Sequence, residues 1–197
     1  MDIEVKKLSP ELESDYIEFF DNNAFSDGSD FAGCYCTWYH WTDDLEEERS
    51  QCSEKMKNCF KKELAKTNIR KGLLQGYLAY LDGKVVGWCN ADERGNYYRI
   101  NEINRPDLWE DYVVTDKVKS IVCFVVTPNM RGKGVATTLL KTLCVDAKND
   151  SYRYIEAYPA KGEFKELNYH GPYSMYEKLG FILQDNRTNE TVVRLYL

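Results

Sequence analysis

Residues 125–136 read Val-Val-Thr-Pro-Asn-Met-Arg-Gly-Lys-Gly-Val-Ala. The run 119–126 that leads into them is almost continuously β-branched, aromatic and apolar, which is typical of a strand buried on both faces. Beyond the glycines, apolar residues recur at helical spacing over residues 135–147. The sequence therefore predicts a buried strand, a glycine-rich turn and an amphipathic helix in direct succession.

This turn is suited to binding a phosphate group. The first N–H groups of a helix have no intrahelical partner, and the helix dipole favours negative charge there. Gly132 and Gly134 let the backbone approach a phosphate closely, and Arg131 and Lys133 add positive charge. The pattern predicts a diphosphate site at the start of the helix.

Three other interpretations of this turn make different demands on its sequence. A Walker P-loop needs a further glycine upstream and a Ser or Thr directly after the Gly-Lys pair, and this turn has neither. A dinucleotide-binding fold needs a third glycine and a βαβ unit that opens the domain. A helix cap with a purely structural role stays open, because glycine is frequent at helix ends.

The rest of the chain predicts mixed α/β structure in one domain, residues 1–197. Asp82-Gly83 between two apolar runs predicts a β-hairpin over residues 76–90, because both turn residues need positive φ. Residues 26–44 carry no clean period and predict a loop. Helices are expected over residues 10–22, 45–70 and 173–179, and strands over 3–8, 154–158, 181–183 and 192–196. Within 45–70, a core stripe is expected from Cys52, Met56, Cys59, Phe60 and Leu64.

Two motifs in this order resemble the GNAT superfamily of N-acetyltransferases. Arg131-x-x-Gly134-x-Ala136 is similar to the family's acetyl-CoA motif, Arg/Gln-x-x-Gly-x-Gly/Ala. Residues 175–181, Met-Tyr-Glu-Lys-Leu-Gly-Phe, resemble its C-terminal signature, Leu-Tyr-Glu-Lys-x-Gly-Phe. The resemblance covers residues 74–197 well and the N-terminal part only loosely.

The resemblance implies an acyl-CoA N-acyltransferase fold, with a mixed, mostly antiparallel sheet flanked by helices. It also implies direct transfer of an acetyl group from acetyl-CoA, as co-substrate, to a primary amine on a small molecule or peptide. Residues 1–72 would form the acceptor side and residues 73–197 the acetyl-CoA core. The resemblance also implies that the protein could form a homodimer. The alternative function is a CoA-binding sensor that has lost its chemistry.

Candidate cofactor residues follow from the same resemblance. The backbones of Phe124, Val125 and Val126 would pair with the pantetheine amides. The family's CoA-contacting asparagine falls at Tyr169, which leaves the adjacent Asn168 as a candidate. The pyrophosphate would be held by Arg131, Gly132, Lys133, Gly134, Val135, Ala136 and Thr137.

Two residues are catalytic candidates. Tyr176 stands at the family's tyrosine position and is the hypothesised acid that protonates the departing thiolate; otherwise it is a packed aromatic beside Phe181. Glu156 is the hypothesised base, because a carboxylate in an apolar strand is costly unless it is paired or lies in a solvated cleft. It could instead point to solvent, and Asp92 and Glu93 are rivals for the role.

Composition excludes some classes of partner. The net charge is −6, so the chain lacks the surplus of Lys and Arg that nucleic-acid binding requires. No run of eighteen apolar residues is present, and the N-terminus has no apolar signal stretch, so a cytoplasmic protein with no membrane partner is expected. In that compartment the seven cysteines would be reduced thiols.

Residues 31–41, Phe-Ala-Gly-Cys-Tyr-Cys-Thr-Trp-Tyr-His-Trp, are the least usual stretch. The aromatics could form a cage for a cationic amine, or they could cover the sheet. A zinc site from Cys34, Cys36 and His40 with Cys52 or Cys59 has poor spacing, and no metal is expected. A nucleophilic cysteine lacks a recognisable histidine partner motif.

Overall fold

A computed structural model describes residues 2–101, 116–159, 169–186 and 191–197. Within these residues a seven-stranded sheet has the order β1-β2-β3-β4-β5-β7-β6. Neighbouring strands are antiparallel except β4 and β5, which are parallel. The strands are β1 (Glu4–Lys7), β2 (Gly76–Leu81), β3 (Lys84–Glu93), β4 (Val118–Val126), β5 (Tyr154–Ala157), β6 (Ile182–Asn186) and β7 (Thr191–Tyr196).

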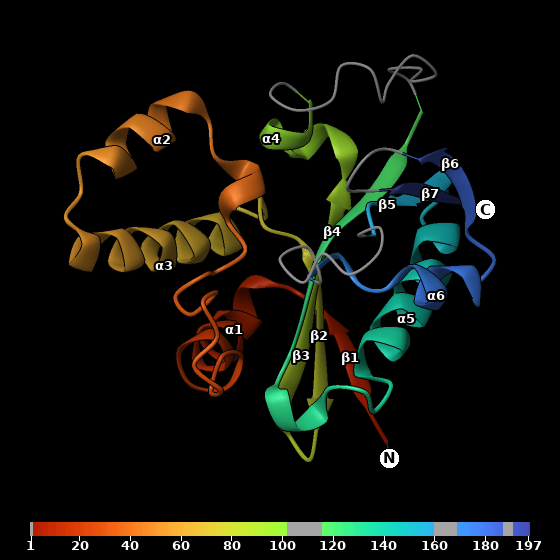
Figure 1. Cartoon of the computed structure of the whole chain (residues 1–197), viewed down its shortest axis with the longest axis horizontal. Coiled ribbons are helices and arrows are strands. Elements are labelled where there is room, and N and C mark those ends of the chain that lie inside the picture. The colour runs from red at the N-terminus through yellow and green to blue at the C-terminus, as the bar shows by residue number, and fades with distance from the viewer. Residues whose placement is uncertain (1, 102–115, 160–168, 187–190) are drawn as a thin grey trace.

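Helices cover both faces of the sheet (Figure 1). On one face α5 (Val135–Asn149) packs against β2, β3 and β4. On the other face α1 (Glu13–Glu18) and the π-helical turn η2 (Phe19–Asn23) contact β3, and α3 (Glu54–Arg70) packs against α1. The remaining described helices and turns are η1 (Pro10–Leu12), η3 (Trp38–His40), α2 (Asp43–Ser50), η4 (Arg94–Asn96), α4 (Tyr98–Asn101), η6 (Pro128–Met130) and α6 (Tyr173–Glu177).

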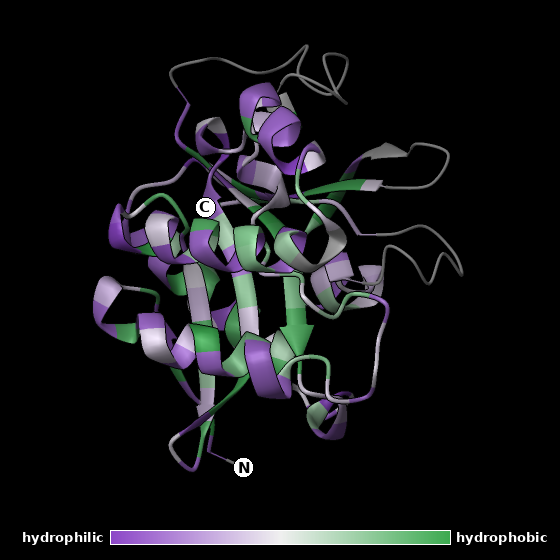
Figure 2. Ribbon diagram, turned by 90° about the vertical axis from the view of Figure 1, so that its left-hand side faces the viewer, coloured by the Kyte–Doolittle hydropathy of each residue, from purple (hydrophilic) through white to green (hydrophobic). Residues whose placement is uncertain are grey.

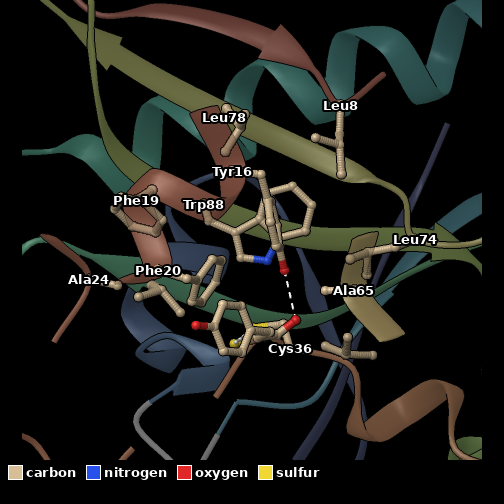
Figure 3. Close-up of a cluster of buried hydrophobic side chains, with 14 of the residues drawn as sticks. Leu8, Tyr16, Phe19, Phe20, Ala24, Cys36, Ala65, Leu74, Leu78 and Trp88 are labelled. Carbon is tan, nitrogen blue, oxygen red and sulfur yellow. Dashed lines mark hydrogen bonds between the residues drawn. The ribbon is translucent and has the colours of Figure 1, made fainter. Parts of the chain in front are cut away.

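The two faces of the sheet form two separate hydrophobic cores. Side chains alternate along paired strands, so the register partners Trp88 and Val125 face the α1 side, while Cys89 and Phe124 face the α5 side. The strands are mostly hydrophobic in Figure 2, whereas the helices carry hydrophilic residues as well. Figure 3 shows the α1-side core, where the Tyr16 ring meets the Trp88 ring edge-on at 4.9 Å.

The elements with strong local signals lie where the sequence places them. The β2–β3 hairpin turns at Asp82 and Gly83, with φ values of 50° and 76°. β4 is buried almost throughout, and α5 presents its apolar residues to the sheet. The predicted fold class, a mixed and mostly antiparallel sheet flanked by helices, is confirmed.

The prediction of one helix over residues 45–70 is wrong. The structure has two helices, α2 and α3, separated at residues 51–53. Thr42 accepts a hydrogen bond from the N–H of Leu45 and caps the first helix, and Ser53 precedes the second in an extended conformation. The expected core stripe is not observed either. Met56 and Cys59 are exposed, and Ala65 and Ile69 are buried instead.

None of the helices in the described part of the chain combines the length and apolar character needed to cross a membrane.

Candidate functional site

The pairing between the parallel strands β4 and β5 ends partway along β4, where β5 itself ends. Their register runs from Val118 with Tyr154 to Ile121 with Ala157 and ends there. β4 continues to Val126 and stays paired with β3 on its other side. Within the described residues, the edge of β4 from Val122 to Val126 that faces β5 is therefore not covered by a strand. Extended backbone of this kind can accept an extended ligand as an additional strand.

The open edge leads directly into the glycine turn. Gly132 and Gly134 have φ values of 73° and 87°, in the left-handed region that favours glycine. A Cβ atom on either would meet no atom of the described residues within 4 Å, so these residues leave the space beside both open. The first bond within α5 runs from the N–H of Thr138 to the carbonyl of Gly134 at 2.9 Å. The N–H groups of residues 135–137 precede that bond, as in an anion site at a helix start.

The Arg131 side chain makes two contacts beside this turn. Its Nε donates to the carbonyl of Val126 at 3.2 Å, and its Nη1 forms an ion pair with Asp27 at 2.5 Å. That hydrogen bond lowers the pKa of Asp27, against a smaller effect of burial. Arg131 therefore joins the end of β4 to the N-terminal segment.

A cavity of about 530 Å³ lies beside the open end of β4. Its lining includes five predicted cofactor residues: Phe124, Val125, Val126, Arg131 and Ala136. It also includes five aromatic residues from other parts of the chain: Phe25, Phe31, Trp38, Tyr39 and Tyr169. The structure thus brings the predicted cofactor strand and the unusual stretch 31–41 to one cavity.

The other predicted cofactor residues occupy different positions. Gly132, Lys133 and Gly134 form the exposed turn, and Thr137 is half-buried in the first turn of α5. The Val135 side chain is buried and lies so close to β3 that a Cβ atom on Gly87 would be 2.6 Å from it. Only the backbone of Val135 is therefore available to a ligand. Asn168 lies outside the described residues.

Tyr176 is fully buried on α6, directly behind the cavity wall. Its ring contacts Phe124, with ring centroids 6.5 Å apart, and its hydroxyl donates to the carbonyl of His170 at 2.6 Å. Burial raises the pKa of Tyr176 well above its usual value, so the hydroxyl is protonated and can act as a donor.

Glu156 lies in a buried ion-pair cluster. Its Oε2 accepts from Arg194 Nε at 2.7 Å, and its Oε1 accepts from the Tyr158 hydroxyl at 2.7 Å and from Arg94 at 3.4 Å. Both oxygens are occupied and the residue does not line the cavity. These contacts are typical of a structural anion, and the role of Glu156 as the base stays a prediction.

The two rival carboxylates also lie off the cavity lining. Asp92 accepts hydrogen bonds from the backbone of Glu93 and from Asn96, and burial raises its pKa. Glu93 is exposed at the end of β3.

A pair that the sequence did not indicate stands closer to the cavity. The hydroxyl of Tyr39, which lines the cavity, is 3.4 Å from Nε2 of buried His170. The backbone carbonyl of His170 is the group that accepts the Tyr176 hydrogen bond. The two residues are 131 positions apart, so no local pattern could have predicted the contact.

The zinc alternative needs Cys34, Cys36 and His40 to meet Cys52 or Cys59. Among the residues that the structure describes, no three His, Cys, Asp or Glu side chains are grouped so that they could hold a metal ion.

Residues 34–181 match the model of the Acetyltransferase (GNAT) family. Among the curated proteins, none matches the sequence. Similar solved structures share the fold at low identity. PaiA N-acetyltransferase of Thermoplasma acidophilum, in complex with coenzyme A, is 15% identical over 100% of both chains, with a TM-score of 0.56.

Two further structures have the same fold. The yncA protein of Salmonella typhimurium, with its cofactor acetyl-CoA, is 14% identical over 99% of this chain and 94% of that one, with a TM-score of 0.54. The polyamine N-acetyltransferase of Drosophila melanogaster is 11% identical over 100% of both chains, with a TM-score of 0.56.

Proposed function

The chain belongs to the acetyltransferase (GNAT) family, and from that membership we propose that it transfers an acetyl group from acetyl-CoA to a primary amine. The nitrogen of the amine attacks the thioester carbonyl directly, a C–N bond forms and the C–S bond breaks. The ammonium form of the amine must first lose a proton, and the thiolate that leaves must gain one.

One observation carries the proposal: the open edge of β4 runs without interruption into the N-terminus of α5. An extended arm that carries amides can pair with residues 122–126. A diphosphate at its end would then meet the N–H groups that precede the first bond of α5, beside Gly132 and Gly134. This order of groups matches acetyl-CoA, whose thioester, amides and diphosphate follow one another.

The aromatic lining of the cavity supports an amine as the acceptor. Phe31, Trp38 and Tyr39 line the same cavity as the strand that would hold the thioester arm. Aromatic ring faces attract a cationic ammonium group and also bury an apolar body next to it. We expect an acceptor whose amine is attached to an aromatic or aliphatic framework.

Tyr39 and His170 are the groups that we propose for proton removal. An alkylamine with a pKa of about 10 is protonated at neutral pH, so its proton must be accepted within reach of the cavity. The Tyr39 hydroxyl lines the cavity and adjoins His170 Nε2, so a proton can pass from the ammonium group through the hydroxyl to the imidazole. Tyr176 remains the proposed donor to the thiolate.

The test measures thiol release from acetyl-CoA in the presence of aromatic amines, polyamines, amino acids and a peptide amine, with mass spectrometry of the product. We expect release that depends on an acceptor, and calorimetry should show coenzyme A binding. Tyr39→Phe should lower turnover and change its pH profile while coenzyme A affinity is kept. Tyr80→Phe, which removes a hydroxyl outside the cavity lining, is the matched control.

Two results would contradict the proposal in different ways. Coenzyme A binding with no thiol release for any amine would favour the sensor function. Failure to bind coenzyme A would remove the basis of the whole assignment.

A further inference from the structure

Two thiols from distant parts of the chain meet in the cavity wall. The Sγ of Cys36 donates a hydrogen bond to the Sγ of Cys123 at 3.3 Å, although the residues are 87 positions apart. Both residues are buried within the protein, and both line the cavity. A molecule small enough to enter the cavity can therefore reach both sulfur atoms. The proposed acetyl transfer does not use either thiol.

The backbone at Cys36 is held in an unusual conformation. Its φ is 48°, in the left-handed region that residues other than glycine rarely adopt. Buried hydrogen bonds fix it: the Tyr16 hydroxyl donates to the carbonyl of Tyr35 at 2.7 Å, and Asn90 Nδ2 donates to the carbonyl of Cys36 at 3.0 Å. Figure 3 shows the Tyr16 hydroxyl pointing toward the backbone beside Cys36. Strain that the surroundings maintain in this way is frequent at functional positions.

The same hydrogen bonds determine where the Cys36 thiol lies. Asn90 on β3 is the register partner of Cys123 on β4, and its side chain also accepts from the Tyr97 hydroxyl at 2.8 Å. One side chain therefore ties the Cys36 backbone to the pair of strands that carries Cys123. The contact between the thiols is thus built into the packing rather than formed by two free side chains.

From this geometry we infer that Cys36 and Cys123 are a reversible oxidation site, which forms a disulfide inside the cavity. The oxidant is a small peroxide or a small disulfide. With hydrogen peroxide, the two thiols lose two protons and two electrons, the S–S bond forms, the O–O bond breaks and two molecules of water are released; an alkyl hydroperoxide releases one alcohol and one water instead. With a small disulfide, exchange through a mixed disulfide releases two small thiols.

The rate of this reaction is limited by protonation. Hydrogen bonding with Cys123 and then burial raise the pKa of Cys36 well above that of a free thiol, and the thiolate is the reactive form. We expect oxidation over a long incubation with excess oxidant.

The disulfide should act on acetyl transfer, a consequence that rests on the proposed function. The sulfur atoms must move from 3.3 Å to a bond length of about 2.05 Å, which draws the segment that carries Cys36 toward β4. The same segment continues into Trp38 and Tyr39 on the aromatic wall. A displacement of about 1 Å at reacting groups can cost about a hundred-fold in rate, so we expect turnover to fall at least ten-fold. The diphosphate turn is not part of the linkage, so coenzyme A affinity should be kept.

The experiment treats the reduced protein with hydrogen peroxide or oxidised glutathione and maps its disulfides by peptide mass spectrometry. We expect a linkage between the peptides of Cys36 and Cys123, loss of acetyl transfer and recovery with dithiothreitol. Cys123→Ser and Cys36→Ser should each prevent the linkage, so one variant suffices if the other does not fold. Cys144→Ser, on α5 and outside the cavity lining, should behave as the wild type.

Three other outcomes are distinguishable, and each contradicts a different claim. If no linkage forms between these two residues, or if Cys34 takes the place of either, the oxidation site is wrong. If the linkage forms and turnover is unchanged, its effect on transfer is wrong. If the reduced protein neither binds coenzyme A nor releases thiol, the proposed function fails, and the disulfide map still decides whether the site exists.

Discussion

The Tyr176 hydroxyl donates to the backbone carbonyl of His170 at 2.6 Å, and the ring of the same histidine adjoins Tyr39. His170 therefore stands between the residue proposed as proton donor and the residue that lines the cavity. The Tyr176 hydroxyl must turn from the carbonyl to reach a thiolate. The Tyr176 ring contacts Phe124, which lines the cavity.

Tyr176→Phe should lower turnover by about a hundred-fold, the usual effect of removing a positioned acid, while coenzyme A affinity stays within about two-fold of wild type. Steady-state kinetics with calorimetry would check both values. Tyr80→Phe, which also removes a hydroxyl hydrogen bond, is the control. Turnover equal to wild type would leave Tyr176 as a packing residue.

Gly134→Ala should weaken coenzyme A binding by about ten- to a hundred-fold, which is what the loss of one hydrogen bond to a charged group costs. The new Cβ atom would occupy the open space beside the turn. Gly83→Ala is a matched control, because Gly83 also has positive φ and open space around its Cβ position. Both variants should lose about 1–2 kcal/mol of unfolding free energy from the left-handed backbone, and only the first should lose affinity.

Glu156→Gln should lower the free energy of unfolding by about 3–5 kcal/mol, because it removes the buried carboxylate charge that pairs with Arg194 and Arg94. Burial opposes the charged form of Arg194, yet the neighbouring Glu156 raises the pKa of Arg194 above its usual value. Urea unfolding would measure the change. Glu13→Gln, in the ion pair with exposed Arg70, should cost much less. A stable Glu156→Gln protein with greatly reduced turnover would support Glu156 as the base.

His40 should make the fold sensitive to mild acid. Burial lowers the pKa of His40 from 6.5 to about 4, with a hydrogen bond to the Asn96 backbone as a smaller, opposite effect. Between these values the unfolded chain binds a proton that the folded chain does not, so stability is full above pH 6.5 and is lost as the pH falls toward 4. The loss reaches about 3 kcal/mol at the lower limit.

His40→Gln should flatten the curve of unfolding free energy in that window, and the two curves should run parallel above it. A wild-type slope that persists unchanged in the variant would assign the acid sensitivity to other groups.

Local signals predicted much of the fold. The hairpin at Asp82-Gly83 and the succession of β4, turn and α5 depend on neighbouring residues, so the sequence predicted them correctly. The break between α2 and α3 also had a local signal, Ser53 directly before α3, but the charged helical pattern on both sides obscured it.

The chemistry of the site was less predictable, because it depends on contacts between distant residues. Glu156 was an unusual acid in an apolar strand, but its arginine partners are 62 and 38 positions away. The contacts of Cys36 with Cys123 and of Tyr39 with His170 likewise join residues that are far apart in the sequence. The spacing of residues along the chain does not specify which distant side chains will pack together.

The ion-pair cluster at Glu156 lies where the pairing of β4 with β5 ends. Glu156 is the register partner of Ser120, one residue before pairing ends, and Tyr158 connects its carboxylate to the Ser120 hydroxyl. The cluster thereby ties β5 to β4 directly before the open edge of β4. We expect this edge to be preorganised, so that a ligand binds without backbone rearrangement and less conformational entropy is lost on binding.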